Sequence, residues 1–209
     1  AGFVIITLGS AFQYYLKEND RPVANNHRAP GQWFDKRLLE ITHITDTLAH
    51  TLEDLFRLNP VVQVLFTISP VRHIRDGVTD NNRSKARLLE AVHTLYNRYD
   101  QVHYFPAYEL VIDVLRDYRF YDIDMVHPNY AATSFVWEQF TELCLSPGTK
   151  PVMKEVLDIT TARNHRPRFP DTQAHRQFRA DYAARVRSLI TRYPFLHLQE
   201  ELDYFSDRS

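Results

Sequence analysis

Short runs of apolar residues alternate with longer amphipathic segments along the N-terminal part of the chain. Each run is continuously apolar and rich in β-branched side chains, which is typical of a buried strand in a parallel sheet. Three such strands are predicted, at residues 3–8, 61–68 and 102–105. Helical stripes of apolar residues are predicted at residues 46–58, about 88–99 and about 129–145. This alternation predicts an α/β fold with a parallel sheet covered by helices.

Polar segments separate these elements, and residues 21–37 and 71–83 are predicted as long loops because turn-forming residues cluster there. After Pro147 and Gly148 no further strand is predicted. We therefore expect an α/β domain at residues 1–146, followed at residues 147–209 by a helical C-terminal extension that packs on it.

Residues 163–192 form an arginine-rich stretch, with eight arginines and two acidic residues. The rest of the chain holds 17 basic and 24 acidic residues. Within the stretch, Phe178, Tyr182, Val186 and Leu189 share one helical face. We interpret the stretch as an amphipathic helix packed across the acidic α/β body. A docking surface for an anionic partner is the alternative.

The overall composition narrows the class of protein. A formal net charge of −1 argues against a strongly basic nucleic-acid-binding protein, and no apolar run approaches the ~20 residues that span a bilayer. A single cysteine, Cys144, excludes an internal disulfide framework and a cysteine-based zinc site. We expect Cys144 to be a packed core thiol and the protein to be cytoplasmic, with no cofactor and no metal.

The first predicted strand begins almost at Ala1, and no signal-peptide pattern precedes it. We interpret the chain as N-terminally incomplete, with an unpaired flank at the strand formed by residues 3–8. An exposed strand edge favours pairing with another chain, so we expect edge-mediated self-association.

Polar side chains that follow the predicted strands are the first candidates for chemistry, because open parallel sheets bind ligands beyond the carboxyl ends of their strands. Asp124 and His127 follow the third strand in an Asp-x-x-His arrangement. A carboxylate that accepts the Nδ1 proton of an imidazole fixes its tautomer and leaves Nε2 to take a proton from a serine hydroxyl. We expect Pro128 to begin the next helix and so to hold His127 at a helix start.

The same spacing occurs at Asp100 and His103, which lie before the third strand and therefore at the opposite end of the sheet. We interpret that pair as structural. For Asp124 and His127, a catalytic role and a capping or salt-bridging role both remain open.

Other polar residues lie near the same predicted edge. Ser10 follows the first strand, where a turn residue is the favoured interpretation and a nucleophile or pocket hydroxyl the alternative. Asn25, Asn26 and His27 are candidate donors to an oxyanion, although loop asparagines usually form turns. Arg72 and His73 follow the second strand. They are candidates to bind an anion, and internal ion pairs are the alternative.

Several segments, taken in order, resemble the GSCFA-domain family. They are residues 5–12, 23–27, 66–73, 76–77, 82–86, 104–109, 115–121 and 124–128. This family is similar to the SGNH (GDSL-like) hydrolases, which are α/β/α esterases and acyl hydrolases. The resemblance implies a three-layer parallel sheet of flavodoxin-like type. It also implies that Asp124 and His127 are the acid and base of a catalytic triad.

Two departures from the family pattern affect the expected site. The Gly-Ser-Cys-Phe-Ala motif expected to hold the serine nucleophile does not occur in the 209 residues, so we expect that serine upstream. Asn25-Asn26-His27 stands where the family usually has Asn-Cys-His. The turn at residues 9–12 begins with Gly9 and lacks the asparagine that lines the SGNH oxyanion hole, which leaves Asn25, Asn26 or backbone amides for that role.

The resemblance implies a serine ester hydrolase or acyltransferase that acts on a small-molecule or carbohydrate-linked ester. A non-catalytic SGNH-like binding or scaffold protein is the alternative. Without the upstream serine, we expect residues 1–209 alone to have no esterase activity.

Overall fold

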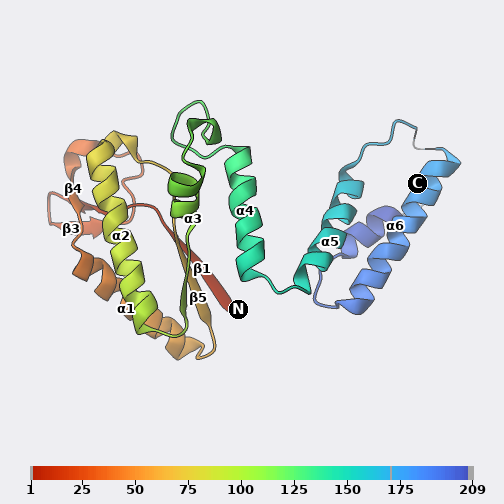
Figure 1. Cartoon of the computed structure of the whole chain (residues 1–209), viewed down its shortest axis with the longest axis horizontal. Helices are drawn as coiled ribbons and strands as arrows, with labels where there is room; N and C mark the ends of the chain where they lie inside the picture. Colours follow the sequence, from red (N-terminus) through yellow and green to blue (C-terminus); the bar gives the residue numbers. More distant parts are fainter. Residues whose placement is uncertain (1, 170, 207–209) are drawn as a thin grey trace. The chain divides into compact units, whose positions relative to one another are not determined.

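The computed structural model describes residues 2–169 and 171–206. By internal contacts the chain divides into two compact units, Ala1–Phe140 and Thr141–Ser209 (Figure 1). The first unit contains all the strands found in the described residues, and the second contains three helices.

A parallel sheet lies at the centre of the first unit, as the sequence pattern predicts. Its strands are ordered β1 (Phe3–Leu8), β5 (Gln63–Ile68) and β6 (Val102–Phe105). Leu8 of β1 pairs with Ile68 of β5, so the two strands end at the same level. The loops that follow them therefore begin side by side at the carboxyl edge of the sheet.

Helices lie on both sides of this sheet (Figure 1). Helices α1 (Ile41–Leu58) and α2 (Val78–Arg98) cover one face, where Val64 and Phe66 of β5 are fully buried in the main core. Helix α4 (Tyr130–Cys144) faces the other side, where the ring of Phe140 packs edge-on against Phe105 at 5.3 Å. The three helical stripes of the first 145 residues are thus confirmed as helices. Helices α1 and α2 bury several side chains in the core, whereas in α4 only Ala132 is buried and Trp137 is 53% exposed.

A second, antiparallel sheet contradicts the loop predicted at residues 21–37. Its strands are β2 (Phe12–Leu16), β3 (Arg21–Val23) and β4 (Phe34–Leu38), in the order β3-β2-β4. A 3-10 turn, η1 (Gly31–Trp33), precedes β4. The two outer strands are short and carry Pro22 and several charges, which edge strands tolerate. Proline and charged residues are also typical of loops, so the sequence pattern did not indicate strands here.

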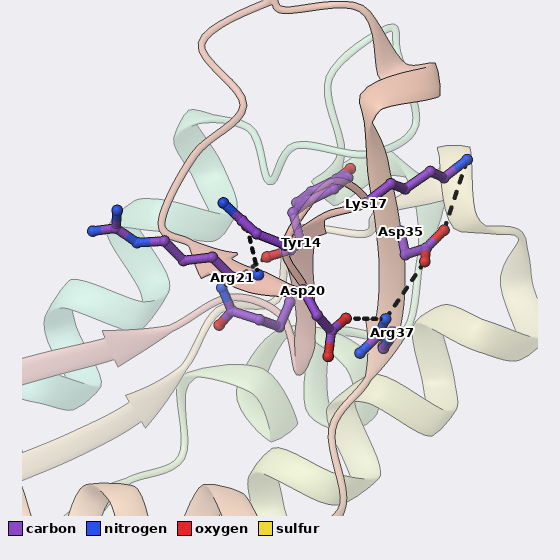
Figure 2. A network of polar contacts seen from close by, with 8 residues as sticks. Tyr14, Lys17, Asp20, Arg21, Asp35 and Arg37 are labelled. Atoms are coloured by element: carbon purple, nitrogen blue, oxygen red, sulfur yellow. Dashed lines mark hydrogen bonds and ion pairs between the residues drawn. The ribbon is translucent and has the colours of Figure 1, made fainter.

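The exposed face of this antiparallel sheet carries a network of charges (Figure 2). Arg37 pairs with Asp20 at 2.5 Å and with Asp35 at 3.4 Å, and Lys17 lies 3.7 Å from Asp35. The charges alternate in sign and satisfy one another. We therefore assign the network to the surface of the sheet and not to a binding site.

Short irregular helices connect the remaining elements of the first unit. The predicted loop at 71–83 is shorter than expected, because η2 (Ile74–Asp76) is followed at once by α2. After β6 the chain forms three short segments: α3 (Ala107–Glu109), the π-helical η3 (Leu110–Leu115) and η4 (Tyr118–Phe120).

The second unit consists of α5 (Thr149–Asn164), α6 (Gln173–Arg192) and α7 (Gln199–Ser206). The apolar stripe of α6 is confirmed, and within this unit it packs against α5 and α7. Arginines of this unit pair with acids of the same three helices, for example Arg192 with Glu155 and Arg163 with Glu201, each at 2.5 Å. The acidic partners of the arginine-rich stretch are therefore local.

Two further findings bear on the composition. Cys144, expected to be a core thiol, is exposed at the end of α4. No helix in the described ranges is long and apolar enough to cross a membrane.

Candidate active site

The Asp124–His127 pair lies in a tight turn between η4 and α4. Asp122 N donates to His127 O at 2.8 Å, and Met125 N donates to Asp122 O at 2.9 Å. Met125 adopts a left-handed conformation with φ of 57°, which reverses the chain between the acid and the imidazole. The turn thus brings together two side chains that an extended backbone separates.

The Asp124 carboxylate makes three hydrogen bonds within this turn. Oδ1 accepts from Val126 N at 2.9 Å and from His127 N at 3.0 Å. Oδ2 lies 2.6 Å from His127 Nδ1. The backbone N–H of His127, its imidazole and the N–H of Val126 lower the pKa of Asp124 to about 2. Asp124 is therefore ionised at neutral pH and is positioned to hold the proton on Nδ1.

The helix that follows is capped by Asn129, which corrects the expected role of Pro128. Asn129 Oδ1 accepts from Ala132 N at 3.2 Å, while its amide nitrogen donates to Arg119 O at 2.7 Å. Pro128 lies before the helix, in a β-bridge with Tyr121. His127 is therefore held by the turn and this bridge rather than by a helix start.

His127 lies on the rim of an apolar pocket of about 770 Å³ between the parallel sheet and α4. The sheet side of the pocket is formed mainly by Ile5, Thr7, Leu65 and Thr67. The helix side is formed mainly by Ala132, Val136, Trp137 and Phe140. Thr67 Oγ1 is buried on the sheet side with no hydrogen-bond partner among the described residues. The pocket is thus lined mainly by apolar side chains, with His127 and Ser69 among its polar lining residues.

The second Asp-x-x-His sequence has a different geometry. His103 lies on β6, and its Nε2 is 2.7 Å from Gln63 Oε1 on the neighbouring strand. The pair that the structure forms here is therefore His103 with Gln63, at the amino end of the strands.

Ser10 follows Gly9 in the turn that joins the two sheets. Its Oγ accepts a hydrogen bond from Phe12 N at 3.1 Å and lies 3.4 Å from Ser84 Oγ. Ser10 does not line the pocket that His127 borders. Its observed contacts are those of a turn residue.

The loop that holds Asn25, Asn26 and His27 makes local contacts. Asn25 Oδ1 accepts from His27 N at 2.9 Å, and Asn26 O accepts from Ala29 N at 2.8 Å. His27 has a φ of 47°. None of the three candidates lines the pocket beside His127.

Arg72 and His73 lie close to the candidate site, in the loop after β5. The Arg72 guanidinium lies 5.1 Å from the ring centroid of Tyr121, which is in the same turn region as His127. His73 N donates to Asn81 Oδ1 at 2.9 Å. Partial burial and then the nearby Lys85 charge lower the pKa of His73. These contacts attach the loop both to α2 and to the Asp124–His127 turn.

Lys85 of α2 is the most buried charged residue in the described chain, and the sequence pattern did not lead us to consider it. It is 1% exposed, and its Nζ donates to Gly9 O and to Ser69 O, each at 2.6 Å. Burial lowers its pKa to about 8. A signal was present, because Lys85 continues the buried spacing of Leu88 and Val92 back by one helical turn.

Within the described residues, no group of three His, Cys, Asp or Glu side chains is placed to hold a metal ion. The chemistry available at this edge is that of a hydrogen-bonded acid–imidazole pair next to an apolar pocket.

Comparison with protein families gives two matches that together cover most of the chain. Residues 1–140 match the GSCFA family, and residues 156–208 match the C-terminal domain of GSCFA domain proteins. No curated protein and no solved structure matches the chain. The first match covers the whole α/β unit, including the turn that holds His127.

Proposed function

Because the chain belongs to the GSCFA family, we propose that it forms the acid–base part of a serine ester hydrolase or acyltransferase of the SGNH type. The proposal includes the three-layer α/β/α architecture of that superfamily. It is supported above all by one observation, the 2.6 Å contact between His127 Nδ1 and the ionised Asp124 beside an apolar pocket. An imidazole held through Nδ1 has Nε2 available as a general base.

In the proposed reaction, His127 Nε2 takes the proton of a serine hydroxyl while the serine Oγ attacks the acyl carbon of the ester. The imidazolium then gives this proton to the departing alkoxide, which leaves as the alcohol. Water or an acceptor alcohol, deprotonated by the same nitrogen, then attacks the acyl carbon, and the imidazolium returns the proton to the serine oxygen as the acyl–serine bond breaks. Asp124 keeps its charge throughout and stabilises the imidazolium.

The serine belongs, by family resemblance, to the Gly-Ser-Cys-Phe-Ala motif, which the 209 residues do not contain. Ser10 is the alternative within the chain, but its hydroxyl already accepts the hydrogen bond of Phe12 N. The proposed substrate is a small-molecule or carbohydrate-linked ester, with its acyl group toward the apolar pocket. A cytoplasmic location also remains part of this proposal.

Replacement of the general base tests the assignment. In protein expressed from its complete coding sequence, His127→Ala should lower kcat for short acyl esters by at least ~100-fold, because proton transfer in the transition state is lost. His103→Ala is the matched control and should retain the activity. Equal turnover in wild type and both variants contradicts the proposal.

A non-catalytic scaffold is a second candidate, favoured by one observation. The turn after β1 offers no asparagine side chain, and Asn25 is engaged in its own loop. An activity-based fluorophosphonate probe separates the two candidates, since it labels an activated serine. Labelling that disappears in His127→Ala excludes the scaffold. Absence of labelling in intact protein supports it.

Strand β1 lies at one edge of the parallel sheet and pairs with β5 only, which supports the proposed edge-mediated self-association of the chain. Phe3 is 73% and Ile5 56% exposed on the outer strand of the parallel sheet. Residues 1–209 expressed alone should elute as a dimer or larger species in size-exclusion with light scattering. Ile5→Lys should shift this population toward monomer, because a charge on the strand opposes pairing. Thr42→Lys, on an exposed turn of α1, is the control, and an equal shift there contradicts the edge interpretation.

A further inference from the structure

Two adjacent parallel strands separate just beyond the point where their ladder ends. Ser69 N still donates to Leu8 O at 2.9 Å, which extends the β1–β5 pairing by one residue. After this bond, Gly9 leads into the antiparallel sheet, whereas Ser69 leads to the rim of the pocket. The carbonyls of Gly9 and Ser69 thus lie where the two loops diverge.

Lys85 of α2 forms a hydrogen bond to each of these two carbonyls. Its Nζ donates to Gly9 O and Ser69 O, each at 2.6 Å, and the side chain is almost completely buried. The preceding residue, Ser84, accepts from Ala11 N at 2.7 Å. Two consecutive residues of α2 therefore hold the backbone on both sides of Ser10 and also hold the loop that borders the pocket.

Stability alone does not explain a lysine at this position. Burial of an ammonium group is costly, and here its hydrogen bonds go to backbone carbonyls instead of a carboxylate. An apolar side chain continues the stripe at Leu88 and Val92 without that cost. Buried charged groups with displaced pKa values at the ligand-binding edge of a sheet are frequent at functional sites.

The charge acts on one peptide group in particular. Gly9 C=O and Ser10 N–H belong to the same peptide unit, so an ammonium at the oxygen polarises the unit and makes the N–H a stronger donor. Such an N–H is the kind of group that stabilises an oxyanion.

We propose that Lys85 is a positioning residue that polarises the Gly9–Ser10 peptide and fixes the two loops after β1 and β5, the second of which lines the pocket beside His127. We call the two hydrogen bonds from Lys85 Nζ to Gly9 O and Ser69 O the lysine clamp. The effect of this clamp on catalysis rests on the proposed function, whereas the clamp itself does not.

Other titratable groups near Lys85 or near its neighbour His73 come from three elements. His73, in the loop after β5, senses the Lys85 charge, which lowers its pKa. Asp76 of η2 and Lys36 of β4 pair with each other and act on His73 with opposite signs. Because the pKa of His73 is displaced downward from 6.5 while that of Lys85 is about 8, the two titrations fall in different pH windows.

The pH dependence of stability and that of activity should have opposite signs. The folded pKa of about 8 lies below the ordinary value of 10.5, so between these values the unfolded chain binds more protons than the folded chain. Stability therefore rises with pH in that window. Activity should fall there, by up to tenfold per pH unit above pH 8, if the charged form of Lys85 is the active one. A merely structural lysine does not separate the two in this way.

Carbonyl ¹³C NMR of the full-length protein tests the clamp without any substrate. With ¹³C-carbonyl glycine and serine, the Gly9 and Ser69 signals should move together with a midpoint near pH 8. In Lys85→Arg, which keeps charge and donors but does not titrate in this range, both signals should stay constant. Signals that stay constant in wild type between pH 7 and 9.5 overturn the proposal.

Activity profiles of the same proteins test the consequence for catalysis. Wild type should lose kcat/KM above pH 8, and Lys85→Arg should retain it to higher pH. An identical alkaline decline in both overturns the positioning role. If Lys85→Arg does not fold, the melting temperature and kcat/KM of the wild type are compared over pH 7–9.5. A decline of both quantities with rising pH contradicts the positioning role. If wild type hydrolyses no ester yet its carbonyl signals titrate, the proposed function fails and the clamp stands.

Discussion

The tetrapeptides Asp100-Gln-Val-His103 and Asp124-Met-Val-His127 differ at one position, yet their side chains are arranged in different ways. In the second, the carboxylate and the imidazole are 2.6 Å apart. In the first, the imidazole bonds Gln63 on the next strand. The valine at the third position is buried in both tetrapeptides, with Val102 1% and Val126 7% exposed. Burial of this valine therefore does not account for the difference.

Backbone conformation accounts for it. Asp100 lies in the turn before β6, whereas Val102 and His103 belong to the strand, so the acid and the imidazole are on different elements. The second tetrapeptide lies in a turn in which Met125 is left-handed, and both N–H groups after it donate to Asp124. The same spacing therefore gives the acid–imidazole contact only where all four residues lie in one turn.

The largest contrast is expected from the two carboxylates. Asp124→Asn should lower kcat for ester hydrolysis by at least ~100-fold, because the amide no longer stabilises the imidazolium and its N–H favours the wrong tautomer. Asp100→Asn should leave kcat within about twofold, a change of less than 0.5 kcal/mol in the barrier. Steady-state assays on short acyl esters measure both.

Similar effects of Asp124→Asn and Asp100→Asn on kcat would contradict the different roles given to the two tetrapeptides. A comparable loss in Asp100→Asn shows that the strand-start pair contributes to catalysis. Full activity in Asp124→Asn shows that the turn is a structural cap, which is the alternative that the sequence left open.

The turn itself provides the next contrast. Met125→Val places a β-branched side chain at a φ of 57°, which should destabilise the protein by ~1–2 kcal/mol and loosen the Asp124–His127 contact. Met125→Asn should be tolerated, since asparagine adopts left-handed conformations readily. Urea unfolding and kcat measure the two consequences. Equal stability of the two variants contradicts the role given to the left-handed residue.

Much of the first unit was predictable because its apolar runs have the period of the elements they form. The three parallel strands and their covering helices follow from continuous β-branched runs and helical stripes, which depend on local sequence and burial. The antiparallel sheet was not predictable in this way. Its strands β3 and β4 are edges that carry Pro22, Lys36 and Arg37, and edge strands need no continuous apolar run.

The site was predictable in part for similar physical reasons. The carboxyl-edge rule led to Asp124 and His127, because topology fixes which loops meet. The rule says nothing of Lys85, whose role comes from a helix that passes beneath those loops. Net charge likewise did not tell that acids on α5 and α7 pair with arginines of the arginine-rich stretch.

The smallest expected effect, and the most direct measure of the turn, is the titration of Asp124. Its pKa of about 2 lies below the ordinary 3.8, so its hydrogen bonds stabilise the fold above pH 4 and this contribution is lost as pH falls toward 2. In His127→Ala the imidazole bond disappears, whereas the N–H groups of residues 126 and 127 still donate. The pKa of Asp124 in that variant should therefore rise but stay below 3.8, as ¹³C NMR of the carboxyl carbon will measure. A pKa that returns fully to 3.8 shows that the backbone turn depends on the imidazole, and an unchanged pKa shows that the Nδ1 contact adds nothing to the turn.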